Sequence, residues 1–468
     1  MTGLKSRERV WEAAQRKPRC QIKTIRETGE PFALMRDYKT VAFHTLGCKV
    51  NQYDTQAMRE RFEEAGYVTA DFEGAADVYV INTCTVTGTG DKKSMQTIRR
   101  CHRQNPEAAI VVTGCLAQRA ADTLTLPGVR LVLGTQRRGE VVELLHAALE
   151  QDAALIAVES LRQAPFERLT VHAHEGHTRA TMKIQEGCDR WCTYCIIPSV
   201  RGPIRSRPID EICAEAESLA QAGFREVVLT GIHLTSYGRE KHGEITLLDA
   251  IRAVHGVEGI RRIRLGSLEP VIVTPEFVEG VAKLPKVCHQ FHLALQSGSD
   301  TVLARMRRRY TSGQFLEACR LLREAFDDCA LTTDVMTGFP GETEAEFEET
   351  KATCRAAGFS RMHVFPYSER EGTKAAQMEG SVPRPVREAR ARALIALGQE
   401  MEREALWARV GKTDEVLVEE IDGQGDGLGY TGGYLRVRVP QAAPGQIVRV
   451  RITGVAGEEL TGVLAPEG

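Results

Sequence analysis

The chain has 468 residues, of which 42% are hydrophobic and 26% charged, so it is neither a fibrous nor a disordered protein. Its 61 basic and 63 acidic residues nearly balance, so composition alone does not indicate a nucleic-acid-binding protein. No apolar stretch is long enough to cross a membrane and the first residues do not resemble a signal peptide, so we expect a cytoplasmic protein without membrane contacts.

Residues 1–38 are polar and rich in arginine, and they show no sustained hydrophobic periodicity. We therefore expect a weakly ordered N-terminal extension. Met35 stands just before the first predicted strand, and our hypothesis is that residues 1–34 are dispensable or follow from a misplaced start codon. A chain that begins at Met35 and has lost activity or solubility would contradict it.

Strands and helices alternate over residues 39–150, and the β-branched strands predict a parallel α/β domain. Three of these strands, in "VAFHTLGC", "DVYVINTC" and "AIVVTGC", end at Cys48, Cys84 and Cys115. Open α/β sheets bind ligands at this carboxyl edge, so the shared position favours a common site. The alternative is that the three cysteines are buried small hydrophobic residues.

Residues 151–173 read as a linker, and six further strand–helix units follow over residues 174–405. Their strands lie in "TMKIQEG", "EVVLTGI", "RIRLGSL", "QFHLALQSG", "LTTDVMTGF" and "RMHVFPYS". This repetition predicts a complete or partial parallel barrel, whose functional residues lie at the carboxyl ends of its strands.

Residues 406–468 alternate polar and apolar side chains at period two, between glycine-rich turns, which predicts a small antiparallel β-barrel. Such barrels commonly bind oligonucleotides, although a structural cap would share the pattern. Tyr430 and Tyr434 are candidates for stacking on bases, the alternative being that they fill the small core.

Local basic runs are the other candidate RNA contacts. The runs are Arg99–Arg103, Arg201–Arg207, Arg261–Arg264 and Arg305–Tyr310. We single out Arg307, Arg308 and Arg309 as residues that could meet RNA phosphates. Any one run is equally compatible with a solvated helix face or strand end.

The segment "EGCDRWCTYCIIP" places Cys188, Cys192 and Cys195 on a short loop after the first barrel strand. Four thiolates would close a zinc site or saturate every iron of a [4Fe-4S] cluster, whereas three leave one metal position open. The loop therefore predicts an iron–sulfur site with room for an exogenous ligand. The alternatives are a loop of unligated cysteines and a zinc site, which would be completed by a histidine such as His172, His174 or His177.

This spacing, with Tyr194 before the last cysteine, resembles the signature of the radical S-adenosylmethionine enzymes. The motifs "TLGCKVN", "NTCTVT", "GCLAQ", "QEGCDRWCTYCIIP", "LTGIHLTSYG", "LQSGSDTVLARM", "GFPGET" and "YSEREGT" follow the order seen in their methylthiotransferases, and the tail resembles their RNA-binding TRAM module. The resemblance implies that the loop cysteines hold a radical-generating [4Fe-4S] cluster with S-adenosylmethionine on its open iron. It also implies that Cys48, Cys84 and Cys115 hold an auxiliary [4Fe-4S] cluster, which carries the sulfur to be transferred.

Small or polar residues at the predicted strand ends could approach S-adenosylmethionine. They are Gly231, Glu269, Gln296, Ser297, Gly338 and Gly341. A role in forming turns explains the glycines equally well.

Within this family, "VAFHTLGCKVNQYDTQAMRERFEEAGY" and "CIIPSVRGPIRSR" resemble most the branch that acts on threonylcarbamoyl-modified adenosine (t6A) in tRNA. That branch adds a methylthio group to C2 of the adenosine just 3′ of the anticodon, and the resemblance implies an electron donor such as flavodoxin or ferredoxin. Ala294, where relatives commonly have proline, and "LGSLEP" are departures that leave the cysteines intact.

Three other functions remain open at this point. Two are methylthiotransferases, one for isopentenyl-modified adenosine in tRNA and one for an aspartate of a ribosomal protein. The third is a zinc-containing RNA-binding protein without catalytic activity, which would use the same cysteines and the same tail.

Overall fold

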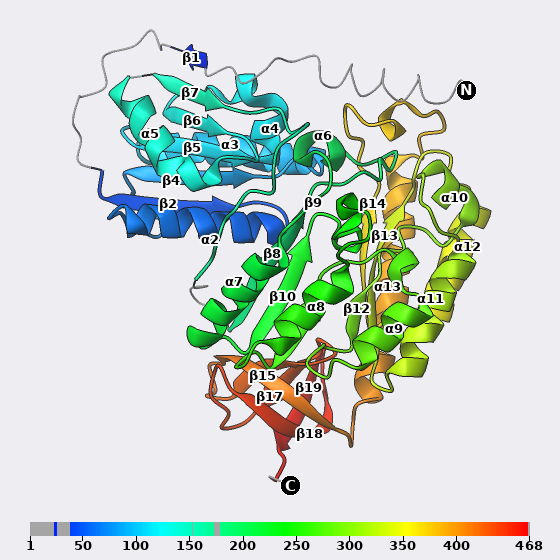
Figure 1. Ribbon diagram of the computed structural model, residues 1–468. Coiled ribbons are helices and arrows are strands. Elements are labelled where there is room, and N and C mark those ends of the chain that lie inside the picture. Colours follow the sequence, from blue (N-terminus) through cyan, green and yellow to red (C-terminus); the bar gives the residue numbers. More distant parts are fainter. Residues whose placement is uncertain (1–22, 26–37, 152, 173–177, 467–468) are drawn as a thin grey trace. The chain divides into compact units, whose positions relative to one another are not determined.

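The computed structural model describes residues 23–25, 38–151, 153–172 and 178–466 (Figure 1). The chain folds as two compact units. The first holds the described residues up to Val171 together with Glu186–Arg190 and Cys195–Arg205, and the second holds the rest. The predicted central domain over 174–405 is therefore not continuous, because two parts of the cysteine loop belong to the first unit. Which unit a loop packs with depends on tertiary contacts, and these are not encoded in local sequence patterns.

The first unit contains a seven-stranded sheet in the order β1-β7-β6-β5-β4-β2-β3. Its strands are β1 (Lys23–Ile25), β2 (Thr40–Thr45), β3 (Val68–Thr69), β4 (Val78–Thr83), β5 (Ala109–Gly114), β6 (Val129–Leu133) and β7 (Ala154–Ala157). All neighbours pair in parallel except β1 and β7, which are antiparallel. The predicted parallel α/β domain is confirmed.

Strands β1 and β7 lie where the sequence did not predict strands. Strand β1 falls within the expected weakly ordered extension. Residues 1–22 and 26–37 lie outside the described residues, so most of the segment named in the hypothesis about residues 1–34 is not described. Strand β7 falls within the predicted linker over 151–173, so the first domain extends past its predicted end at residue 150. Four-residue strands such as β7 are too short to show a clear period.

Helices cover both faces of this sheet, which is why its central strands β4, β5 and β6 are buried along their whole length. The helices are α2 (Lys49–Glu64), α3 (Gly88–Gln104), α4 (Cys115–Ala120) and α5 (Val141–Glu150), with short 3-10 turns η1 (Ala121–Leu124) and η2 (Arg138–Glu140). Met58 and Phe62 of α2 share one apolar cluster with α5, while Ile98 of α3 and Leu116 of α4 lie in the cluster on the other face. The short helix α6 (Ile197–Arg201) also belongs to this unit.

The second unit is built around six parallel strands. They are β8 (Arg179–Glu186), β10 (Glu226–Gly231), β11 (Arg262–Leu265), β12 (Gln290–His292), β13 (Ala330–Thr337) and β14 (Arg361–Pro366). One sheet has the order β11-β10-β8-β9, where β9 is Arg205–Ser206, and the other has the order β12-β13-β14. Parallel bridges such as Leu268↔Leu293 join the two, so the predicted partial barrel is confirmed with its six strands where the sequence placed them.

Helices pack outside these strands in one continuous apolar core (Figure 1). They are α7 (Ile209–Gln221), α8 (Leu247–Gly256), α9 (Pro275–Ala282), α10 (Asp300–Arg305), α11 (Ser312–Ala325), α12 (Glu344–Ala357) and α13 (Arg384–Trp407), with 3-10 turns η3 (Leu234–Ser236), η4 (Arg239–Lys241), η5 (Pro270–Ile272) and η6 (Ala375–Gln377). Capping boxes led by Thr246, Thr311 and Thr343 begin α8, α11 and α12, since each threonine and the residue three positions on satisfy the free amides of the first turn.

The C-terminal residues form a closed barrel in the order β15-β16-β17-β19-β18. Its strands are β15 (Thr413–Ile421), β16 (Gly427–Thr431), β17 (Arg436–Val439), β18 (Ile447–Ala456) and β19 (Glu459–Leu464). Neighbours are antiparallel apart from β17 and β19, so the predicted small barrel is confirmed. Among the described residues, no helix combines the length and the apolar character needed to span a bilayer.

Candidate active site

Cys48, Cys84 and Cys115 lie together at one edge of the first sheet. Cys84 and Cys115 directly follow β4 and β5, and Cys48 follows the short turn after β2. These three strands are neighbours in the sheet. A Cβ atom added to Gly47, the residue before Cys48, would lie 3.0 Å from the Cys84 sulfur. The proximity of Cys48 also raises the pKa of Cys84 and of Cys115. The structure thus brings together the cysteines that the strand pattern singled out.

Burial opposes ionisation of Cys84 and Cys115. It raises the pKa of Cys115 to about 11, against the opposing effect of Arg201, and it raises the pKa of Cys84 as well. Thiolates are the form that binds iron, so a positive charge at this edge favours a metal centre. Arg201 supplies that charge, since its Nε donates a hydrogen bond to the Cys115 sulfur over 3.2 Å.

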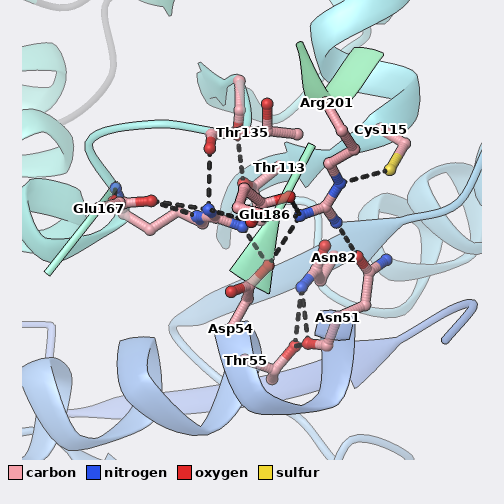
Figure 2. Close-up of polar contacts among 12 residues, drawn as sticks. Asn51, Asp54, Thr55, Asn82, Thr113, Cys115, Thr135, Glu167, Glu186 and Arg201 are labelled. Atoms are coloured by element: carbon pink, nitrogen blue, oxygen red, sulfur yellow. Dashed lines mark hydrogen bonds and ion pairs between the residues drawn. The ribbon is translucent and has the colours of Figure 1, made fainter. Parts of the chain in front are cut away.

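Arg201 is one of two buried arginines in a polar network (Figure 2). Its Nη1 lies 3.2 Å from both Asp54 Oδ2 and Glu186 Oε1. Arg138 pairs with the same Asp54 and donates from Nε to Glu167 over 2.8 Å. Since an unpaired buried charge costs several kcal/mol, this sharing keeps each guanidinium compensated and holds it in one orientation.

Amide side chains tie the cysteine-bearing turns together. Asn51 donates from Nδ2 to the carbonyls of Leu46 (2.7 Å) and Thr83 (3.1 Å), which lie two residues before Cys48 and one before Cys84. Asn82 donates back to the Asn51 carbonyl over 2.9 Å (Figure 2). Gly114, just before Cys115, has φ +96°, and a Cβ there would overlap Asn82 Oδ1. A glycine is therefore needed for the chain to turn into α4.

Cys188 and Cys195 belong to the first unit. The Cys188 amide donates to the Gly202 carbonyl over 3.0 Å. Gly187 has φ +74°, and any Cβ there would overlap the carbonyl oxygen of Pro203. The chain just before the first loop cysteine is thus fixed by a close backbone approach that only glycine permits.

Cys192 belongs to the second unit, where it is buried. Arg308 donates from Nη1 to its sulfur over 3.3 Å, and Arg308 Nη2 lies 3.2 Å from Glu269 Oε1. The Arg308 side chain is only 7% exposed, so the predicted RNA contact is corrected for this residue: its charge faces a cysteine and a carboxylate. Arg307 and Arg309 are exposed.

The polar residues expected near S-adenosylmethionine occupy different surroundings. Glu269 is buried, with Oε2 3.2 Å from Nε2 of His233, a histidine that sequence reasoning did not single out. Gln296 has φ +65° and forms a bridge to β13. Ser297 is fully buried, and its hydroxyl lies 3.2 Å from that of Thr350 on helix α12, so it already has a packing role.

The glycines of this set permit close approaches. A Cβ on Gly231, the last residue of β10, would lie 2.8 Å from Gln185 Cβ. Gly338 has φ +69° and abuts Arg387, while Gly341 has φ +75° and donates to the Gly380 carbonyl over 2.7 Å. Turn formation, the alternative weighed above, accounts for Gly338 and Gly341.

Tyr430 and Tyr434 stack on each other with centroids 4.9 Å apart. The guanidinium of Arg179, in β8, lies 5.0 and 4.9 Å from the two ring centroids, and that of Arg264, in β11, lies 4.7 Å from Tyr434. The rings therefore attach the C-terminal barrel to the strands of the same unit, instead of presenting a free stacking surface.

The basic run Arg261–Arg264 serves the same attachment. Arg264 donates to Glu226 Oε1 over 2.8 Å and to the Gly432 carbonyl over 2.9 Å, and Arg262 donates to the Glu415 carbonyl over 2.6 Å. Burial would raise the pKa of Glu226, but the arginines lower it overall. Arg262 and Arg264 are thus corrected from candidate RNA contacts to internal ion pairs.

The run Arg201–Arg207 is corrected in the same way. Its three arginines, Arg201, Arg205 and Arg207, are all buried. A signal for this was present in the sequence: the run follows the cysteine loop directly and is interrupted by Gly-Pro, so it cannot form one solvated helix face.

Across the described residues, no three His, Cys, Asp or Glu side chains are arranged around a position for a single metal ion. Cysteine thiolates are the usual ligands of iron–sulfur clusters, so the donor set at the sheet edge is compatible with such a group. Of the histidines in the zinc alternative, His174 and His177 lie outside the described residues.

Family models match three parts of the chain. Residues 40–134 match the "Uncharacterized protein family UPF0004", residues 182–354 the radical SAM superfamily and residues 408–465 the TRAM domain. These correspond to the first sheet with its three cysteines, to most of the partial barrel and to the C-terminal barrel.

Named relatives match over most of the chain. A Bacillus subtilis protein named threonylcarbamoyladenosine tRNA methylthiotransferase MtaB is 44% identical, over 88% of this chain and 93% of its own length. The Aquifex aeolicus protein of the same name is 38% identical, over 85% of this chain and 100% of its own length. A tRNA-2-methylthio-N(6)-dimethylallyladenosine synthase of Symbiobacterium thermophilum is 36% identical, over 91% and 94%.

The fold resembles that of the radical S-adenosylmethionine methyltransferase TsrM from Kitasatospora setae, solved with cobalamin and a [4Fe-4S] cluster. The TM-score is 0.54 at 17% identity, over 72% of this chain and 77% of that one. The ordered domains and the full-length relatives agree with the cysteine pattern and with the resemblance found in the sequence. The chain therefore belongs to the radical S-adenosylmethionine tRNA methylthiotransferases and is an enzyme of that family.

Proposed function

We propose that this enzyme adds a methylthio group to C2 of t6A, the modified adenosine 3′ of the anticodon in tRNA. The convergence of Cys48, Cys84 and Cys115 at one sheet edge carries the proposal, because sulfur transfer needs a second metal site beside the loop cysteines. The choice of t6A is supported by the names of the relatives at 44% and 38% identity, against 36% for the dimethylallyladenosine synthase.

The six cysteines would hold two [4Fe-4S] clusters, Cys48, Cys84 and Cys115 one and Cys188, Cys192 and Cys195 the other. Three thiols for each cluster leave one iron open for an exogenous ligand. Bound to the protein, the clusters and S-adenosylmethionine supply the sulfur, the methyl group and the radical chemistry.

The chain itself would orient these groups and shield them from water. Arg201 and Arg308 each donate to one cysteine sulfur in a buried setting, where a hydrogen bond to a thiolate is stronger than in water. Gly231, Glu269 and Gln296 would approach S-adenosylmethionine at the ends of the barrel strands. The exposed Arg307 and Arg309 would meet tRNA phosphates.

The proposed reaction also needs an electron donor, for which a flavodoxin or ferredoxin is the expected class. Because the substrate is tRNA, we place the enzyme in the cytoplasm. The exposed surface of the C-terminal barrel would help to bind the tRNA. Tyr430 and Tyr434 would not be the contacts, because Arg179 lies over both rings.

The metal content tests the proposal. We would reconstitute the protein anaerobically and measure iron and sulfide per chain. About eight irons are expected for the wild type and about four after either set of three cysteines is changed to alanine. Cys213→Ala, a change at a partly buried cysteine outside both sets, is the matched control and should keep about eight. Zinc, or only about four irons in the wild type, would exclude a separate sulfur carrier.

The substrate is tested in tRNA from cells that lack the protein. Mass spectrometry of the nucleosides should show unmethylthiolated t6A in place of its 2-methylthio form, with the isopentenyl nucleosides unchanged. Loss of the 2-methylthio group from isopentenyladenosine instead would move the enzyme to the other tRNA branch. A change confined to a ribosomal protein would exclude a tRNA substrate.

A further inference from the structure

We infer that Arg201 is a positioning residue of the sulfur-carrying site: it holds the Cys115 sulfur through an N–H···S hydrogen bond and makes a cluster bound there easier to reduce. The inference rests on the proposed function, in which Cys115 is a cluster ligand. Neither the family models nor the names of the relatives assign this residue a role.

The contacts of Arg201 leave its guanidinium little freedom. The side chain is fully buried, and each nitrogen has its own partner. Nε donates to Cys115, Nη1 lies between Asp54 and Glu186, and Nη2 donates to Asn51 Oδ1 (Figure 2). A planar donor held on three sides cannot swing away from the sulfur, so its N–H stays directed at Cys115.

The backbone around Arg201 is fixed as well. Gly202 has φ +72°, and a Cβ there would lie 2.7 Å from Leu161 Cβ, while its carbonyl accepts from the Cys188 amide. The segment that fixes the chain at the first loop cysteine therefore also delivers the donor to Cys115. A shift of this turn would change both contacts together.

The chemistry follows from the donor type. Hydrogen bonds to the ligand sulfurs of iron–sulfur clusters are among the factors that set their reduction potentials, because they stabilise the added negative charge. The effect is large where water is excluded, as around Arg201. Removing the N–H should therefore shift the potential to more negative values.

Two substitutions separate the hydrogen bond from the charge. In Arg201→Gln the amide nitrogen takes the place of Nε and keeps a donor near Cys115, whereas Arg201→Met puts a methyl group there. Both lose the charge and the pairs with Asp54 and Glu186 to the same extent. Any difference between the two then reports the N–H···S bond alone.

The test uses full-length protein carrying Cys188→Ala, Cys192→Ala and Cys195→Ala, so that only the Cys115 site can hold a cluster. Electron paramagnetic resonance would follow its one-electron reduction by dithionite at controlled solution potentials. At the solution potential where half of the cluster in the Gln variant is reduced, the ratio of reduced to oxidised cluster in the Met variant should be about threefold lower. This corresponds to a midpoint potential about 28 mV more negative in the Met variant, at 59 mV per tenfold change.

Equal midpoints in the two variants would overturn the inference. Absence of any cluster from the parent with three alanines would instead contradict the proposed function. Arg138→Met is the matched control, because Arg138 is equally buried and pairs with Asp54 but has no hydrogen bond to Cys115, so its shift should be smaller than that of Arg201→Met. If the Arg201 variants do not fold, the same comparison with Asp54→Asn added lowers the excess of buried negative charge that the loss of Arg201 leaves behind, and decides the question.

Discussion

The attachment of the C-terminal barrel should depend on the buried guanidinium of Arg264. Its Nε donates to Glu226, its Nη groups donate to the carbonyls of Thr431 and Gly432, and it lies against the ring of Tyr434. Arg264→Met keeps the apolar bulk of the side chain but removes all of these contacts.

The magnitude follows from what would be left behind. Glu226 would be left with more distant cations such as Arg262, whose Nη1 is 3.7 Å away, and at least one buried carbonyl would lose its donor. Removing one partner of a buried ion pair costs about 3–5 kcal/mol. Adding Glu226→Gln to Arg264→Met should recover more than about 1 kcal/mol of this loss, because the two side chains share one network.

Amide hydrogen exchange in strand β16 is the assay, since undocking exposes this strand. A loss of about 3 kcal/mol accelerates exchange by about 100-fold, at tenfold per 1.4 kcal/mol. Arg261→Met, at an exposed neighbour, is the control and should change stability by less than about 0.5 kcal/mol. If Arg264→Met exchanged no faster than Arg261→Met, the network would not hold the barrel in place.

Two further predictions concern the loop and pH. Gly187→Ala should leave about four irons per chain, because its Cβ would overlap the Pro203 carbonyl next to the loop cysteines. Gly223→Ala, which also has a positive φ but open space around it, is the control and should keep about eight irons. Equal iron contents in the two variants would contradict this prediction. Hydrogen bonding from Arg305 lowers the pKa of Glu346 to about 2 from an ordinary 4.5, so the pair stabilises the fold above about pH 4.5 and ceases to do so as pH falls toward 2. The thermal midpoint of Glu346→Gln should therefore lie below that of the wild type at pH 6, by the equivalent of about 1 kcal/mol. The gap should narrow as pH falls below about 4.5 and close only near pH 2; a constant gap would contradict the assignment.

Much of the fold was predictable because periodicity is a local property. The six barrel strands and the small C-terminal barrel appear where their patterns are, and Cys48, Cys84 and Cys115 were grouped because parallel strands end at one edge. Strand β7 was missed since four apolar residues carry no period. The membership of Glu186–Arg190 in the first unit was also missed, because it depends on packing between distant segments.

The arginines show where sequence reasoning ended. In sequence, a run of arginines has the same composition whether it faces water or a buried carboxylate. Arg201, Arg264 and Arg308 were all assigned to basic runs, and each is compensated by an acid far away in the chain, such as Asp54 for Arg201. Only the fold reveals those partners.

Part of the attachment of the C-terminal barrel is made to its main-chain atoms. Arg262 and Arg264 bond carbonyl oxygens at Glu415, Thr431 and Gly432, and every residue type offers a carbonyl there. Substitutions at these barrel positions therefore leave the docking contacts available, provided that the strand path is kept. The outer surface of the barrel is thus free to vary in sequence, while the strands of the partial barrel retain an unchanged attachment point for it.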